Sequence, residues 1–174
     1  MVKRIWENGL RSVTIERSGY CEVFITVYCL EGEKIQDILK KLQAELRRTQ
    51  IEVLKFDVFG SLGKYHDFLK QLYQELSGKN VPVTWIEGES CSGDDLAGIQ
   101  VYGISGSAVG SPSREVYASV RCFEDEACKY CLIGNLFPQN TQGSMEEQTE
   151  EVLKGLENTL NASAMEMKNI VIYS

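Results

Sequence analysis

The chain has 174 residues, of which 43% are hydrophobic and 25% charged, and its formal net charge is −7. This length and composition are typical of a globular protein with one large core or two small ones. The acidic balance disfavours binding to a phosphate backbone, which needs a clustered basic surface, so we expect no nucleic-acid partner. No apolar run approaches the roughly 20 residues of a membrane-spanning helix, so we expect no membrane partner either.

The first residues, MVKRIWENGLRS, lack the apolar centre of a signal peptide, which predicts a cytoplasmic location. In that compartment the six cysteines are expected to be reduced thiols rather than a disulfide framework. Most of them fall in or beside predicted strands, where a free cysteine behaves as a small apolar residue. Cys91, in a polar loop, is expected to be the most exposed.

Strands are predicted at residues 13–18 and 22–30. In the second of these, both alternating sets of side chains are largely apolar, which predicts a strand covered on both faces. A helix follows, with one apolar stripe and an opposite face that should meet water. The stripe consists of Ile35, Ile38, Leu39, Leu42 and Leu46, and the water-facing set of Lys40, Lys41, Glu45 and Arg48.

A strand at 51–59 comes next, then a second amphipathic helix that ends near Gly78, and strands at 81–87 and 98–104. Residues 1–105 therefore make one complete predicted module. The small residues of 106–113 read as a linker, because they offer little to bury.

The same order of elements then begins again. Strands are predicted at 115–123 and 129–137, a helix follows with a capping box of Ser144 and Glu147, and a last strand covers 169–173. Gly155, inside the helix, predicts close packing against a sheet. Residues 114–174 thus correspond to the first half of a second module.

This order predicts an α+β fold in which the helices pack on one face of a mixed sheet. The opposite, partly apolar face then needs cover from another sheet, within the chain or from a second subunit. We therefore expect contact between the modules together with self-association.

Chemically distinctive residues are few. Cys128 and Cys131 have the spacing of a zinc or redox pair, but neither a second such pair nor a nearby histidine accompanies them, so we expect no metal. A structural role is the favoured interpretation for these two thiols, with metal-binding and redox roles as the alternatives. Any histidine mechanism must use His66, the single histidine, although a histidine at a helix start is more often a surface or capping residue.

The segment CLIGNLFPQNTQGSMEEQTEEVLKGLENTLNASAMEMKNIVIYS resembles the YjgF/RidA superfamily, which includes the endoribonuclease L-PSP and chorismatase-like proteins. The resemblance lies in the turn Ile133–Gly134–Asn135, the pair Gln148–Thr149 and the strand predicted at 169–173. Residues 13–105 match the whole module more loosely.

The resemblance implies a chorismate-mutase-like fold and a homotrimer with ligand clefts between subunits. RidA-type members hydrolyse imines and enamines such as 2-aminoacrylate without a cofactor. An arginine holds the substrate carboxylate, and a glutamate and a water act in the hydrolysis. Backbone amides near the glycine turn orient the ligand, which makes Gly134 and Asn135 candidate ligand-binding residues here.

Two departures weaken this implied chemistry. Thr84 stands at the place of the family's arginine, two residues after Pro82, and Gly98 stands at the place of the glutamate. The sequence therefore predicts a degenerate site with weak or no deaminase activity. Such a protein would bind a small carboxylate, or form the front part of a two-module protein.

Two alternatives stay open. One is a divergent hydrolase or chorismatase-like enzyme that acts on a small carboxylate in an inter-module cleft, with His66 and Arg121 as candidate catalytic residues. The other is a purely structural or assembly module.

Overall fold

A computed structural model describes residues 1–61, 81–88, 96–106 and 119–171. In these ranges the chain forms a six-stranded mixed sheet, a separate two-stranded hairpin and two α-helices, which is an α+β architecture. The six-stranded sheet has the order β1-β2-β3-β6-β4-β5, in which β4 and β5 are parallel and the other neighbours antiparallel. Its strands are β1 (Val2–Glu7), β2 (Leu10–Glu16), β3 (Cys21–Tyr28), β4 (Glu52–Gly60), β5 (Val83–Glu87) and β6 (Leu96–Ser105).

The first strand was not predicted. β1 pairs along its whole length with β2 through a tight turn at Gly9, whose φ is 72°. It is an edge strand with mostly exposed side chains, so its sequence lacks the alternation that marks a half-buried strand.

Helix α1 (Ile35–Thr49) confirms the first predicted helix and packs its apolar stripe against one face of the sheet. Ile38 and Leu42 are fully buried against Ile25 and Val27 of β3. The prediction that Glu45 meets water was wrong, because only 4% of it is exposed. Arg48 lies beside it and donates two hydrogen bonds to its carboxylate, which allows a charged group to be buried there.

The other face of β3 is not fully covered, contrary to the expectation from its sequence. Val23, Ile25 and Val27 are buried under α1, whereas Phe24, on the opposite face, is 41% exposed. The aromatic ring of Phe24 stacks on that of Tyr102 from β6, so these two residues cover each other within an open surface.

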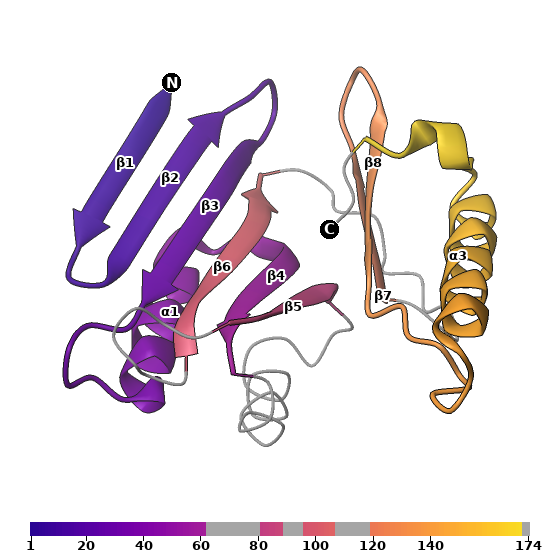
Figure 1. The fold of residues 1–174 in the computed structure, drawn as a ribbon. Coiled ribbons are helices and arrows are strands. Elements are labelled where there is room, and N and C mark those ends of the chain that lie inside the picture. The colour runs from indigo at the N-terminus through magenta and orange to yellow at the C-terminus, as the bar shows by residue number, and fades with distance from the viewer. Residues whose placement is uncertain (62–80, 89–95, 107–118, 172–174) are drawn as a thin grey trace.

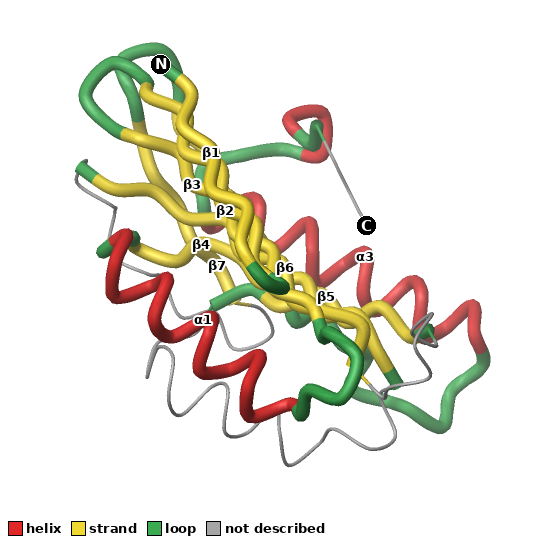
Figure 2. The backbone as a smooth tube through the Cα atoms, turned by 90° about the vertical axis from the view of Figure 1, so that its left-hand side faces the viewer, coloured by secondary structure: helices red, strands yellow, loops and turns green. Residues whose placement is uncertain are grey.

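The hairpin consists of β7 (Ser119–Glu124) and β8 (Lys129–Gly134), and α3 (Met145–Ala162) follows it. Figure 1 shows the hairpin between the six-stranded sheet and α3. In Figure 2, α1 and α3 lie on opposite sides of the strands. The hairpin contacts one end of the six-stranded sheet through Phe123. That this contact joins two modules stays a prediction.

The start of α3 matches its prediction, whereas the close packing expected at Gly155 is not found. Ser144 and Glu147 form the capping box. A Cβ atom on Gly155 would lie an ordinary 3.6 Å from Leu136, so no unusually close packing requires this glycine.

Asn169 ends the 3-10 helix η2 (Met167–Asn169), and residues 170 and 171 are not in a strand. The strand predicted at 169–173 is therefore absent from its described part. A strand needs a hydrogen-bonded neighbour, and no described strand pairs with this segment.

The second predicted helix, His66, Cys91 and nearly all of the predicted linker 106–113 lie outside the described residues. The module boundaries accordingly stay predictions. Among the helices that the structure describes, none is long and apolar enough to cross a membrane.

Candidate ligand site at the inter-module interface

The hairpin and the six-stranded sheet meet through a small apolar cluster. We call this cluster, together with the polar contacts beside it, the inter-module interface, after the modules that the sequence predicts. Phe123 of β7 packs with Tyr20, Leu54 and Ile104 of the first module, and all four are buried. The rings of Phe123 and Tyr20 meet edge-on at 5.7 Å, and the Tyr20 hydroxyl donates to Asp125 at 3.3 Å. This cluster holds the hairpin against the sheet at the end where β4 begins and β6 ends.

Arg121 lies next to this cluster and is only 1% exposed. Its Nη1 donates to Oε1 of Glu52 on β4, 3.3 Å away. Its Nε and Nη2 atoms are buried without a hydrogen-bond partner among the described residues. Burial lowers the pKa of the Arg121 guanidinium and the nearby Glu52 raises it, with burial the larger effect. Arginine nevertheless stays charged in proteins, so this is a buried cation with unused donors.

The two unused atoms have a specific geometry. The Nε–H and one Nη2–H of a guanidinium point the same way and form a two-donor fork that matches the two oxygens of a carboxylate. A buried donor without a partner costs free energy, about 1–3 kcal/mol and more for a charged group. An anion that reached this fork would remove that cost.

The two candidate ligand-binding residues lie on the same hairpin. Gly134 is the register partner of Ser119, and Ser119 lies two positions before Arg121 on β7. Gly134, Ser119 and Arg121 therefore lie on the same face of the hairpin, the face turned toward the first predicted module. Asn135 follows β8 with φ of 58°, and its Nδ2 donates to Ser119 Oγ at 2.8 Å and to the Val81 carbonyl at 3.3 Å. The structure thus places Arg121 and Gly134 on one face of the hairpin, with Asn135 directly after Gly134, and it leaves His66 outside the described residues.

The backbone at Gly134 lies very close to Pro82. A Cβ atom there would lie 2.9 Å from Cβ of Pro82, closer than real contacts allow, and a tight 3.1 Å from its Cα. A side chain at this position would push the hairpin away from the start of β5. The glycine therefore permits the close approach of the hairpin to Pro82.

The structure describes both residues that the resemblance placed at the family's arginine and glutamate, Thr84 and Gly98. Thr84 lies in β5 as a half-buried neutral side chain. At Gly98, in β6, a Cβ atom would lie 2.7 Å from the Val27 carbonyl oxygen. The backbone there has no room for a glutamate side chain.

The cysteines do not all remain thiols. Cys122 and Cys131 are register partners on β7 and β8 and form a disulfide, so the expectation of reduced thiols was wrong for this pair. Cys131 is joined to Cys122 rather than to Cys128, which is an exposed free cysteine. Within the described ranges, no group of three or more His, Cys, Asp or Glu residues could hold a metal.

Sequence reasoning had a signal for this disulfide. Cys122 and Cys131 are nearly symmetric about the tight turn at Asp125–Cys128, where Asp125 Oδ1 accepts from the backbone amides of Ala127 and Cys128. Placing the turn at Asp125 would have fixed the register and put the two thiols opposite each other.

Comparison of the chain with protein-family models, with curated proteins and with solved structures finds no match.

Proposed function

We propose that the inter-module interface binds a small carboxylate and that the protein has weak or no imine-hydrolysing activity. The observation that carries this proposal is Arg121, a buried guanidinium whose Nε and Nη2 lack partners among the described residues. A carboxylate offers two oxygens at the spacing of this fork. Such a ligand would not displace Glu52, because Glu52 binds Nη1 and the ligand would bind Nε and Nη2.

The resemblance to the RidA superfamily supports the location. Gly134, in the turn that resembles the family's ligand-orienting turn, contacts Pro82, two residues before Thr84. Arg121 comes from the second module, and its fork would supply the carboxylate clamp that Thr84 cannot. Weak or absent hydrolysis follows from Gly98, because no carboxylate side chain fits at the place of the family's glutamate.

The test is calorimetric titration of the chain with pyruvate, a small keto acid of the kind that imine hydrolysis yields. We expect Arg121→Met to weaken pyruvate binding at least tenfold, because a buried charge pair is lost, and Arg121→Lys to weaken it similarly, because an ammonium lacks the fork. Arg4→Met, which removes an exposed arginine from β1, is the matched control and should leave binding unchanged. Equal affinity in all four proteins would refute the assignment of Arg121.

Hydrolysis is tested separately by ammonia and pyruvate release from enzymatically generated 2-aminoacrylate. We expect the rate to match spontaneous hydrolysis. Acceleration well above that rate would overturn the second part of the proposal and favour the divergent-hydrolase alternative. A His66→Ala variant would then show whether the single histidine contributes.

A further inference from the structure

The hairpin that carries Arg121 has little support of its own. β7 and β8 form a two-stranded sheet with no third strand among the described residues. Two-stranded hairpins are marginally stable in water and need another surface or a cross-link. Here the surface is the inter-module interface and the cross-link is the Cys122–Cys131 disulfide.

The disulfide lies between Arg121 and Phe123, the two β7 residues that meet the first predicted module. Along β7, Cys122 separates Arg121 from Phe123, and along β8, Cys131 separates their register partners Leu132 and Tyr130. Neighbouring residues of a strand point to opposite faces, so the disulfide occupies the face away from the first module. It therefore fixes the strand pairing behind Arg121 without contacting the ligand fork.

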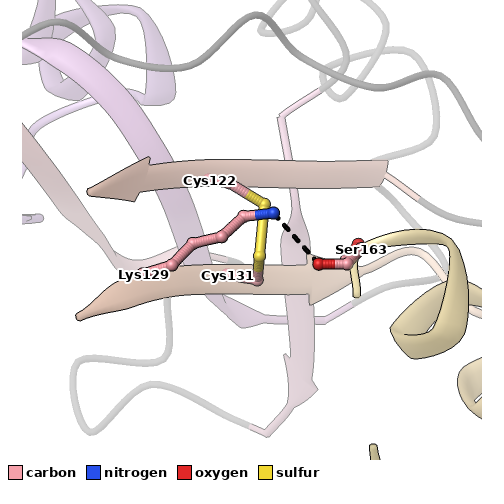
Figure 3. Close-up of a disulfide and its surroundings, with 4 residues drawn as sticks. All are labelled: Cys122, Lys129, Cys131 and Ser163. Carbon is pink, nitrogen blue, oxygen red and sulfur yellow. Dashed lines mark hydrogen bonds between the residues drawn. A yellow bond between two sulfur atoms is a disulfide. The ribbon is translucent and has the colours of Figure 1, made fainter. Parts of the chain in front are cut away.

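The far face of the hairpin is partly open. Cys122 and Cys131 are half-buried. Figure 3 shows the Lys129 side chain passing the disulfide to donate to the Ser163 carbonyl at the end of α3, at 3.0 Å. A small thiol reductant can approach a half-buried disulfide more easily than a buried one.

We propose that the Cys122–Cys131 couple is a redox control on the Arg121 site: the disulfide holds the site closed, and reduction opens it. The binding part of this inference rests on the proposed function. In the oxidised form the fork is inaccessible, so a carboxylate binds only to the fraction of molecules in which the hairpin has moved. Reduction loosens the hairpin, raises that fraction and strengthens the apparent affinity.

The chemistry is a two-electron exchange with a dithiol reductant. One thiolate of the dithiol attacks one sulfur of the pair and releases the other as a thiolate. The second thiol of the reductant then displaces the protein sulfur, which closes the dithiol into its own disulfide. The products are Cys122 and Cys131 as thiols and one oxidised dithiol.

The first measurement does not need a ligand. Phenylglyoxal modifies accessible arginines, and mass spectrometry gives the modification rate at each position. For the full chain we expect dithiothreitol to increase the rate at Arg121 at least fivefold and to leave the exposed Arg4 unchanged. The double variant Cys122→Ser/Cys131→Ser should show the faster rate without reductant, and Cys128→Ser, which leaves the disulfide intact, should behave as the wild type.

The second measurement is pyruvate titration of both redox forms, with an expected affinity at least fivefold higher after reduction. Equal Arg121 modification in the two forms overturns the redox inference, whatever the titration shows. Redox-sensitive modification without pyruvate binding in either form supports the redox inference and refutes the proposed ligand instead. Loss of circular-dichroism signal from the whole chain on reduction also overturns it, because the disulfide would then support the entire fold.

Discussion

Two glycines show how differently one residue type can be used in this chain. Gly134 is required by its surroundings, because Pro82 leaves no space for a Cβ atom. Gly155 is not required, because the nearest atom to its Cβ position lies at an ordinary contact distance, on Leu136. Gly134 allows the hairpin to approach the sheet. Gly155 lowers the helical propensity of α3, and no close packing contact depends on it.

Substituting alanine at each position tests this difference. Gly134→Ala should lower the free energy of unfolding by about 1–3 kcal/mol, as overpacking does when backbone atoms cannot yield. Gly155→Ala should raise it by up to about 1 kcal/mol. Urea unfolding followed by circular dichroism measures both, and a neutral result at Gly134 would mean that the hairpin shifts freely against Pro82.

At the scale of one element, α1 buries a charge in a face that is otherwise apolar. Burial alone would raise the pKa of Glu45, but hydrogen bonds and the charge of Arg48 outweigh it, so the pKa lies below its ordinary value of 4.5. The folded state therefore favours the ionised carboxylate. The stability that Glu45 contributes is present above its unfolded pKa and is lost as pH falls through the lower, folded value.

A pH series of unfolding measurements on Glu45→Gln tests this. At pH 7 the variant should be less stable than the wild type by about 1 kcal/mol, a modest value because Arg48 is half exposed. The difference should shrink as pH falls below about 4.5 and the wild-type carboxyl takes up its proton. Glu150→Gln, at an exposed position of α3, is the control and should show no such trend. A constant difference from pH 7 to 3 would show that packing, and not ionisation, is responsible.

At the scale of the whole molecule, the face of the six-stranded sheet opposite α1 carries exposed aromatic side chains. The strand register places Trp6, Arg11 and Phe24 on this face, opposite α1. Trp6 is 70% exposed, and the Arg11 guanidinium lies 5.5 Å from its ring centre. Exposed apolar patches of this kind often mark interfaces, so the homotrimer implied by the resemblance stays a prediction with a defined surface.

Light scattering coupled to size exclusion tests the trimer. We expect a mass of three times the 19.6 kDa chain, reduced in the double variant Trp6→Glu/Phe24→Glu. Met145→Glu alters an exposed apolar residue on α3, away from this face, and should leave the mass unchanged. A mass of one chain at every concentration would contradict self-association.

Much of the secondary structure could be read from the sequence, because its causes are local. The apolar stripe of α1 and the Ser144–Glu147 capping box involve residues within a few turns of one another. β1 could not be read in this way, because an edge strand is defined by pairing with β2 rather than by burial. The strand expected at 169–173 failed for the converse reason, since Ile170 and Val171 have strand-like side chains but no described strand beside them.

The sequence by itself determined the α+β class and the starts of the two described helices, and it offered Arg121 as one candidate residue. Tertiary structure alone decided what surrounds that residue. Arg121 and Glu52 are 69 positions apart and meet only because Phe123 packs on the first module and Gly134 leaves room beside Pro82. Local patterns follow from sterics and hydrogen bonding over a few residues, whereas the burial of a guanidinium depends on how the hairpin packs on the six-stranded sheet.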